Sequence, residues 1–380
     1  MQKYFIIPII FIIFFGCGRV GDEASKLKTL GAPAIDSGDI IFDIKSKSQL
    51  VDKNGNSYVD KGHYSLLAQS KDREGRPIGN LQNITYEIYE NNSNTASSEA
   101  KVILDKDSRV TTNNILLLLD FSGSLISDCG SLQNELEKDK NLCYQLVESA
   151  KTFIDNTVNE NQNVAIYYFN SKTTITALVT SRTSSATNNK SELKDGLNQL
   201  YDPTFRRTEL EGFSSTNLNG AVIEATKVAC QWVGNCNYDN YSPQNNGNLE
   251  HFEFASIVVF TDGRDSAEIV SESKMFDFMN AHKGLYYYTI GLGNVDTRVL
   301  SAIGRDKYIP VSQNSELDGA FDDLSLELSD WGDSFYKIDY CPATQEGAVD
   351  IRIKVSSEGR IGIISDNITL PENIDFRCDL

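Results

Sequence analysis

Ile115-Leu116-Leu117-Leu118-Leu119-Asp120-Phe121-Ser122-Gly123-Ser124 places a carboxylate and two hydroxyls directly after five consecutive apolar residues. An apolar run without alternation is typical of a strand that is buried on both faces, as in the middle of a parallel sheet. Open α/β sheets bind their ligands just beyond the carboxyl ends of the strands. The stretch therefore predicts an oxygen-rich site, suited to a hard cation, at the edge of an α/β sheet.

Two later segments bring similar side chains to the ends of elements. Ile257-Val258-Val259-Phe260-Thr261-Asp262-Gly263 is again an apolar run that leads to a carboxylate. Ser214-Ser215-Thr216-Asn217-Leu218-Asn219-Gly220 precedes a helical pattern and offers hydroxyls at a loop-to-helix entry. Because the carboxyl ends of parallel strands share one edge of a sheet, we expect Asp120 and Asp262 to lie at the same edge.

Strand and helix patterns alternate through the middle of the chain. Apolar strands are predicted at 115–119, 164–169, 173–179, 256–260 and 285–291. Helical patterns are predicted at 142–158, 191–200, 218–232, 267–282, 296–303 and 315–330. Alternation of this kind predicts an α/β fold with a Rossmann-like, open and mostly parallel sheet that carries helices on both faces.

Shorter strand-like runs lie on either side of that region. Residues 37–110 contain several such runs separated by turn sequences, and residues 333–380 contain several more. A two-stranded ribbon is only marginally stable by itself. We therefore expect the two segments to pack together as a smaller antiparallel β domain, which flanks an α/β domain at 111–332.

The N-terminus has the pattern of an export signal. Lys3 precedes a mostly apolar stretch that is too short to span a bilayer, and Gly16-Cys17 follows it. This pattern resembles a bacterial lipoprotein signal, in which residues 1–16 are removed and Cys17 is lipidated. The resemblance implies a tether at 17–36 and a chain anchored by its lipid in the cell envelope, at the outer membrane or the cell surface. Plain cleavage and a signal anchor are the alternatives.

The other cysteines predict disulfide bonds. An even number of them remains after Cys17, and in an exported chain this favours disulfides over metal thiolates. Many connectivities are open in principle, and free thiols are the alternative. Pairing of neighbours is the simplest scheme, because each bond then closes one local loop. The expected pairs are Cys129–Cys143, Cys230–Cys236 and Cys341–Cys378.

Taken together, the three oxygen-bearing segments resemble the von Willebrand factor A domain family. That family's metal-ion-dependent adhesion site consists of an Asp-x-Ser-x-Ser motif, a Thr on a second loop and an Asp on a third. The matching residues are Asp120, Ser122, Ser124, Thr216 and Asp262, in the family's order. Taken singly, each residue is also compatible with an ordinary turn or helix cap, and their joint occurrence favours the metal site.

The resemblance implies a mechanism of binding. Ser122, Ser124 and Thr216 would coordinate the ion with neutral oxygens, while Asp120 and Asp262 would act largely through metal-bound water. The implied ion is Mg²⁺, with Mn²⁺ as the alternative and Ca²⁺ less favoured. Because few protein anions contact the metal, one position stays open for an Asp or Glu carboxylate of a protein partner.

Charge and motifs narrow the class of function. A formal net charge of −18 argues against nucleic acid, whose binding needs clustered Lys and Arg. We expect a lipid-anchored, non-enzymatic protein-binding module for adhesion or assembly, which meets the membrane through its lipid only. One alternative is a metal-dependent phosphohydrolase with Asp120 as nucleophile, although Ser122 stands where a second Asp is needed. The other is an assembly factor whose metal site only stabilises the fold.

Overall fold

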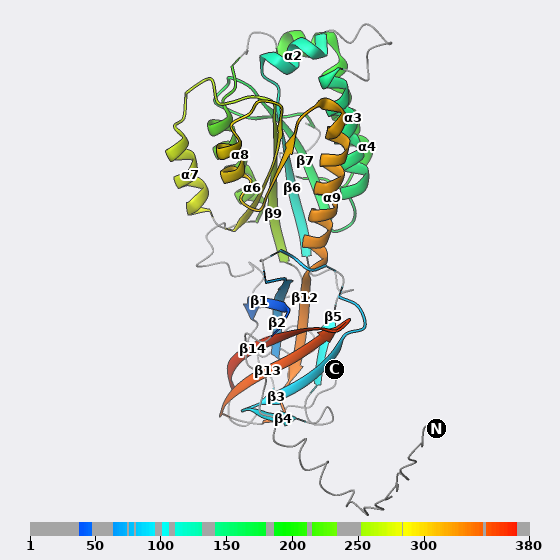
Figure 1. Cartoon of the computed structure of the whole chain (residues 1–380), viewed down its shortest axis with the longest axis vertical. Coiled ribbons are helices and arrows are strands. Elements are labelled where there is room, and N and C mark those ends of the chain that lie inside the picture. The colour runs from blue at the N-terminus through cyan, green and yellow to red at the C-terminus, as the bar shows by residue number, and fades with distance from the viewer. Residues whose placement is uncertain are drawn as a thin grey trace, which may run out of the picture.

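The chain folds into two units, each built on one sheet (Figure 1). The computed structural model describes residues 38–47, 64–73, 76–79, 81–95, 101–105, 111–130, 141–179, 186–210, 215–233, 252–282, 284–344 and 347–370. The predicted signal, Cys17 and the tether lie outside these ranges. Within them, no helix combines the length and the apolar character that a membrane crossing requires.

The α/β unit contains a sheet with the strand order β11-β10-β9-β6-β7-β8. Neighbouring strands are parallel except β8, which is antiparallel to β7. The strands are β6 Thr111–Asp120, β7 Gln162–Phe169, β8 Thr176–Ala177, β9 Phe252–Thr261, β10 Leu285–Leu292 and β11 Lys307–Val311. The central pair, β6 and β9, consists of the two strands that lead to the predicted metal ligands.

Helices cover both faces of this sheet. The helices are α2 Gly123–Gly130, α3 Leu142–Thr157, α4 Lys190–Asn198, α5 Pro203–Phe205, α6 Leu218–Val233, α7 Glu272–Ala281, α8 Thr297–Ile303 and α9 Leu317–Asp333. Ile115 and Leu117 of β6 pack in one core with α3, α4 and α9, whereas Leu116 and Leu118 pack in another with α6, α7 and α8 (Figure 1). Because both faces are buried, the strand carries no polar alternation.

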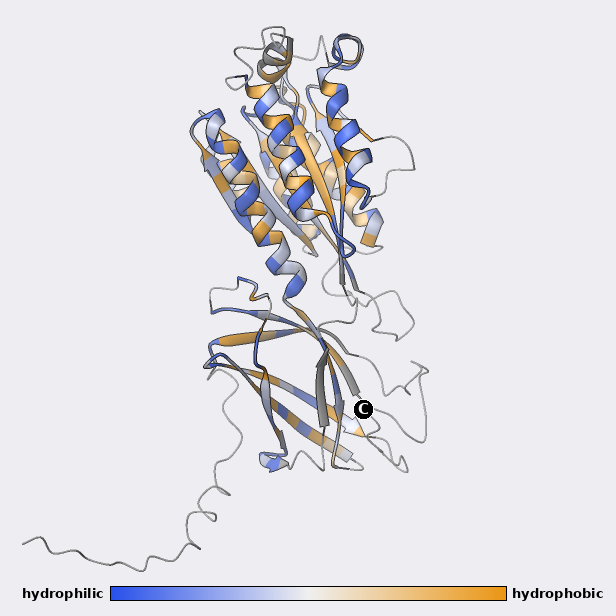
Figure 2. Cartoon of the chain, turned by 90° about the vertical axis from the view of Figure 1, so that its right-hand side faces the viewer, coloured by the Kyte–Doolittle hydropathy of each residue, from blue (hydrophilic) through white to orange (hydrophobic). Residues whose placement is uncertain are grey.

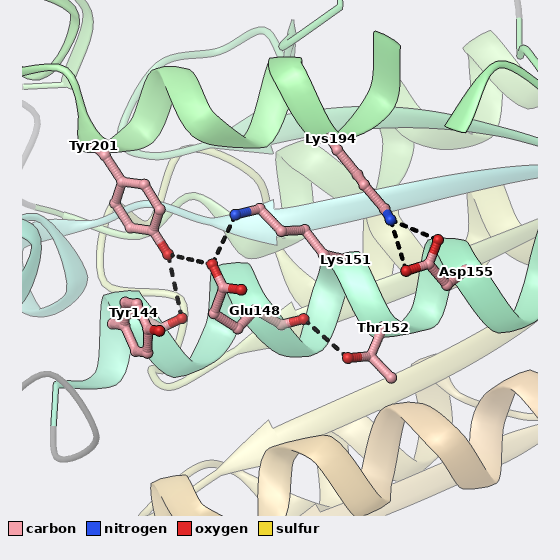
Figure 3. A network of polar contacts seen from close by, with 7 residues as sticks. All are labelled: Tyr144, Glu148, Lys151, Thr152, Asp155, Lys194 and Tyr201. Carbon is pink, nitrogen blue, oxygen red and sulfur yellow. Dashed lines mark hydrogen bonds and ion pairs between the residues drawn. The ribbon is translucent and has the colours of Figure 1, made fainter. Parts of the chain in front are cut away.

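The helices themselves are amphipathic, as Figure 2 shows by the alternation of apolar and polar stripes along them. On the outer side of the first core, a polar network joins α3 to α4 and the 3₁₀ turn Gln199–Tyr201 that follows it (Figure 3). The Tyr201 hydroxyl donates to Glu148 Oε1 at 3.1 Å, and Lys151 Nζ donates to the same oxygen at 2.7 Å. Lys194 pairs with Asp155 at 2.6 Å. These contacts hold the two helices together where they face solvent.

The second unit is a sheet with the strand order β4-β3-β13-β14-β1-β2-β12-β5. Its strands are β1 Ile40–Lys47, β2 Tyr64–Lys71, β3 Thr85–Glu90, β4 Ser93–Thr95, β5 Lys101–Asp105, β12 Phe335–Cys341, β13 Gly347–Ser357 and β14 Arg360–Leu370. Burial alternates along β13, so this sheet has one core face, unlike the fully buried β10. N-terminal and C-terminal strands interleave, which confirms the expected joint β domain. Among the strand pairs that the structure describes in this sheet, only β1 and β14 are parallel.

The last helix of the α/β unit runs directly into the second sheet. α9 ends at Asp333 and β12 begins at Phe335. The carbonyl oxygen of Ser334, between them, accepts a hydrogen bond of 2.9 Å from the Ser70 amide of β2. Leu67 of β2 packs into the same core as α3 and α9. The two units therefore share buried contacts, and the second sheet fixes the C-terminal end of α9.

The fold class expected from the sequence is confirmed, with differences in particular elements. The strand expected at 173–179 is reduced to Thr176–Ala177, because the preceding residues form bends. The helix expected at 267–282 begins at Glu272, since the Ser271 hydroxyl caps it by accepting from the Lys274 amide. The short helix α2 and the edge strand β11, which contains Pro310, were not predicted.

A carboxylate that is partly exposed to solvent lies at the end of the α/β unit nearer the second sheet. Asp306 Oδ2 accepts a 2.7 Å hydrogen bond from the Tyr287 amide, and Arg305 Nε lies 3.9 Å away. Burial raises the pKa of Asp306 from 3.8 to about 6, against the opposing effects of that hydrogen bond and of Arg305. Ionisation of Asp306 is therefore less favourable in the folded protein than in the unfolded chain.

We expect Asp306→Asn to reduce the pH dependence of stability. Because the pKa of Asp306 is higher in the folded protein than in the unfolded chain, this group does not lower the free energy of unfolding below about pH 4. The free energy of unfolding then falls as the pH rises from about 4 to about 6. Because solvent screens this partly exposed group, the loss is on the order of 1 kcal/mol at neutral pH, and the amide, which still accepts from Tyr287, avoids it. Urea unfolding in chelator at several pH values measures this difference. Asp195→Asn, on the exposed face of α4, is the control, and an equal slope in all three proteins would contradict the assignment.

Candidate metal centre

The predicted ligand residues lie at the carboxyl edge of the α/β sheet. β6 and β9 pair in parallel with Leu119 opposite Phe260, so that Asp120 and Thr261 end the two strands side by side. Asp262 follows Thr261 directly. The structure thus places Asp120 and Asp262 at one edge of the sheet, where the pattern of buried strands predicted them.

Asp120 is held inside the protein by two short contacts. Its side chain is fully buried. Oδ2 accepts a hydrogen bond of 2.6 Å from the Thr261 hydroxyl, and Oδ1 accepts one of 3.0 Å from the Ser122 amide. These two donors fix the orientation of the carboxylate without contributing a positive charge.

The electrostatics of the metal-free site are unfavourable for a carboxylate. The pKa of Asp120 is raised from 3.8 to about 7, mainly by burial and also by the neighbouring negative charge of Asp262, although the hydrogen bonds from Thr261 and Ser122 act in the opposite direction. Two acidic side chains at a buried edge need a compensating positive charge. A divalent cation at this edge would supply it.

Thr216 comes from the loop that enters α6, and its backbone is tied to the loop after β9. Its amide donates to the Ser266 hydroxyl at 2.9 Å, and its carbonyl oxygen accepts from the amides of Ser266 and Ala267 at 2.9 and 3.0 Å. Thr216 is buried. This exchange of hydrogen bonds sets the position of the Thr216 side chain relative to Asp262, which lies on the same loop as Ser266.

Gly263 shows that oxygens from these separate segments converge. A Cβ atom built at Gly263 would lie 3.3 Å from Thr216 Oγ1 and 3.9 Å from Asp120 Oδ2. The two oxygens therefore border the same small space, which a side chain at residue 263 would begin to fill. That space is where the residues present would fit a small ion.

The chemistry of the donors selects the kind of ion. Among the described residues, no group of three or more His, Cys, Asp and Glu side chains could hold a metal. The donors at this edge are instead carboxylates and hydroxyls, which suit a hard divalent cation. Ser122 is buried beside Asp120, while Ser124 lies in the first turn of α2 and its side chain is outside the described part.

Several residues that build this site were not found from the sequence. Thr261, which donates to Asp120, is the last residue of β9, and its place directly before Asp262 was the available signal. The Asn217 amide donates to the Asn170 carbonyl oxygen, joining the Thr216 loop to the loop after β7. Asp265 Oδ2 accepts from the Asn219 amide in the first turn of α6. The contacts of Asn217 and Asp265 join residues that are far apart in the sequence, so no local sequence pattern predicts them.

The structure tests some of the predicted disulfide bonds. Cys129 and Cys143 form a disulfide, as predicted, and it joins α2 to the first turn of α3. Cys230 and Cys341 are disulfide-bonded as well. Their expected partners, Cys236 and Cys378, lie outside the described residues.

Comparisons by sequence do not assign the chain. No protein-family model matches it. No curated protein sequence matches it either.

Three solved structures that resemble this chain share little sequence with it. Proximal thread matrix protein 1 from the mussel byssus, in a structure with a zinc-occupied metal-ion-dependent adhesion site, is 15% identical with a TM-score of 0.38 over 64% of this chain and 50% of its own. The ArnB paralog VWA2 from Sulfolobus acidocaldarius is 11% identical, with a TM-score of 0.36 over 89% and 79%. The von Willebrand factor domain of the type V pili tip protein Mfa5 from Porphyromonas gingivalis is 9% identical, with a TM-score of 0.35 over 57% and 94%.

The chain spans about half the length of the mussel protein that it matches. At these identities and TM-scores, none of the three proteins transfers a function to this chain. What the chain binds has to be inferred from its own residues at the carboxyl edge of the sheet.

Proposed function

We propose that this protein is a non-enzymatic binding module, anchored to the bacterial cell envelope by a lipid on Cys17, which engages an acidic residue of a partner protein through a divalent cation. Asp120, Ser122, Ser124, Thr216 and Asp262 would hold the ion. Mg²⁺ suits these donors best, with Mn²⁺ as the alternative. The bound ion would offer one coordination position to an Asp or Glu carboxylate of the partner.

The convergence at Gly263 is the observation that carries this proposal. Thr216 Oγ1 and Asp120 Oδ2 border one space although they come from loops almost a hundred residues apart. The buried Asp120 carboxylate lies beside Asp262, and no cationic side chain of the described residues is among the groups that shift its pKa. The chain's own part in binding is then to hold these oxygens in place, since Thr261 and the Ser122 amide orient Asp120 and the Ser266 contacts orient Thr216.

The environment of Asp120 also favours binding over phosphate hydrolysis. A nucleophilic carboxylate must reach its substrate with a free oxygen. Asp120 is fully buried, and each of its oxygens accepts a hydrogen bond from the protein. Such a carboxylate is suited to orienting a metal or its water.

Gly263→Ala tests whether this space binds the ion. We expect Mg²⁺ affinity to fall about tenfold, because the new methyl group would crowd Thr216 Oγ1, while the free energy of unfolding in chelator changes by about 1 kcal/mol or less. Calorimetric titration with Mg²⁺ and thermal unfolding with and without chelator measure both quantities. Gly319→Ala is the control, because a Cβ at this exposed position of α9 meets nothing within 4 Å.

The same proteins separate the rival functions. Capture of a protein partner from intact cells in Mg²⁺, lost in chelator and weakened in Gly263→Ala, supports the binding module. Capture that is indifferent to chelator in a protein that binds Mg²⁺ would support the assembly factor whose metal only stabilises the fold. Absence of Mg²⁺ and Mn²⁺ binding to the folded wild-type protein would refute the proposal.

A further inference from the structure

A cavity of about 420 Å³ opens directly beside the metal centre. Gly263, the residue next to Asp120 and Thr216, lines both. The cavity lies between the first turns of α6, α7 and α8, and its apolar lining includes Leu218, Val299 and Leu300, which are otherwise almost fully buried. A partner residue that reaches the metal therefore has its neighbouring residues close to this cavity.

The polar lining of the cavity is mostly acidic. Asp265, Glu268, Glu272 and Asp296 contribute carboxylates, and Arg264 contributes the one guanidinium among the lining residues. Two of the four acids are already compensated. Arg298 pairs with Glu272 at 2.5 Å and lies 3.7 Å from Asp296.

The other two acids, Asp265 and Glu268, are not compensated by a cation in the described part of the chain. Asp265 is fixed in place, because Oδ1 accepts from the Glu268 amide at 3.0 Å and Oδ2 from the Asn219 amide at 2.9 Å. Glu268 is exposed and has a left-handed backbone, with φ of 51°. The cavity thus combines an apolar lining with fixed negative charge.

Asn219 provides an independent sign of a missing donor. Its side chain is 7% exposed and lines the cavity. Nδ2 donates to the Val270 carbonyl oxygen at 2.9 Å, and this contact sets the orientation of the amide. Oδ1 is buried and accepts no hydrogen bond from the described residues. A buried acceptor without a donor costs about 1–3 kcal/mol, so a ligand that donates a hydrogen bond here would be favoured.

The rim beside Glu268 also carries apolar surface. Ile269 is 48% exposed, whereas most large apolar side chains of the α/β unit are buried. Ile269 therefore extends the apolar surface that the lining of the cavity provides. Charge, hydrogen bonding and apolar surface therefore point to the same class of ligand.

We propose that this cavity binds a lysine or arginine side chain of the partner protein, close in sequence to the acidic residue that engages the cation. The inference rests on the proposed function and adds the partner's chemistry to it. The aliphatic stem of the basic residue packs on Leu218, Val299 and Leu300, and its cationic end faces Asp265, Glu268 and Asn219 Oδ1. A long side chain with an apolar stem and a donor-rich, positive end matches all three properties of the cavity.

Synthetic peptides test this preference without knowledge of the natural partner. Each peptide carries one Asp and one Arg, joined by glycine spacers of increasing length, and is paired with a peptide in which citrulline, a neutral analogue, replaces Arg. In saturating Mg²⁺, we expect one spacing to bind at least about fivefold more tightly with Arg than with citrulline. That peptide should also shift the methyl NMR signals of Val299 and Leu300.

A matched pair of variants locates the effect. Glu268→Gln should remove the preference for Arg over citrulline. Glu358→Gln should retain it, because Glu358 has the same exposed, left-handed backbone with φ of 51° but lies in the turn between β13 and β14 of the other unit. Added salt should reduce the preference in the wild-type protein.

The outcomes separate this inference from the proposed function. Mg²⁺-dependent binding of the Asp peptides with no preference for Arg at any spacing would overturn the basic pocket and leave the metal function intact. Arg-dependent shifts of Val299 and Leu300 that persist in chelator would support the pocket and overturn the metal bridge. Tighter binding of a peptide with Glu in place of Arg would overturn the inference, since Arg264 would then dominate the cavity.

Discussion

Replacing Asp120 with Asn is expected to abolish the stabilisation of this protein by Mg²⁺ while leaving the metal-free fold at least as stable as the wild type. The Asn side chain keeps an oxygen that accepts from the Ser122 amide or the Thr261 hydroxyl, which are the contacts of the buried carboxylate. It removes the charge that burial and Asp262 both disfavour in the absence of metal. At a Mg²⁺ concentration of about one hundred times its dissociation constant, the wild type gains about 2.7 kcal/mol, and the variant should gain nothing measurable.

Thermal and urea unfolding with Mg²⁺ and with chelator measure the two effects separately. Asp366→Asn is a suitable control, because it removes a buried carboxylate from β14 in the other unit and should leave the Mg²⁺-induced gain unchanged. A variant that is strongly destabilised in chelator would show that Asp120 serves the fold. A variant that still gains stability from Mg²⁺ would place the ion elsewhere.

The α/β fold could be predicted because its strands are fully buried. The run from Ile115 to Leu119 carries no polar position, which is the pattern of a strand covered on both faces, and its alternate residues do enter two different cores. Predictions were weaker where an element is short or exposed. The edge strand β11 is only partly buried and contains Pro310, so it lacks the apolar pattern that marks the central strands.

The order of the strands in the second sheet could not be predicted from local sequence patterns. The N-terminal strands β1 and β2 lie between the C-terminal strands β14 and β12. The alternation of apolar and polar residues predicts a strand with one buried face, but it does not determine which strand lies beside it. Glu90 of β3 adds a contact of the same long-range kind, since its buried carboxylate accepts from the amides of Ala343 and Thr344 beyond β12.

The candidate site also has a part that the sequence predicts and a part that only the folded structure shows. The common edge of Asp120 and Asp262 followed from two buried strands, because parallel strands end together. The approach of Thr216 to Asp120 around Gly263 depends on how the α6 loop docks against the β9 loop through Ser266. The acidic cavity depends on the same docking and on three helix starts from distant parts of the chain, so its existence appears only in the folded structure.

Removing the Cys129–Cys143 disulfide by replacing both cysteines with Ala is expected to lower the free energy of unfolding by about 3 kcal/mol. The bond joins residues 14 apart, and its loss returns the entropy of that loop to the unfolded chain. Both positions are fully buried, and Ala avoids leaving an unpaired polar group there. Urea unfolding of the double variant measures the loss, and a change below about 1 kcal/mol would contradict this account.

The position of this disulfide connects stability with the candidate site. α2 begins at Gly123, directly after Ser122, and the bond fixes the other end of the same helix to α3. We therefore expect the double variant to bind Mg²⁺ about threefold to fivefold more weakly. Without the disulfide, α2 is less firmly fixed, and so is its first turn beside the metal site. Ile351→Ala is the control, since truncating the core of β13 should cost similar stability without touching α2. Equal Mg²⁺ affinity in the double variant and the wild type would limit the bond to a stabilising role, whereas weaker binding in the double variant alone would show that it preorganises the site.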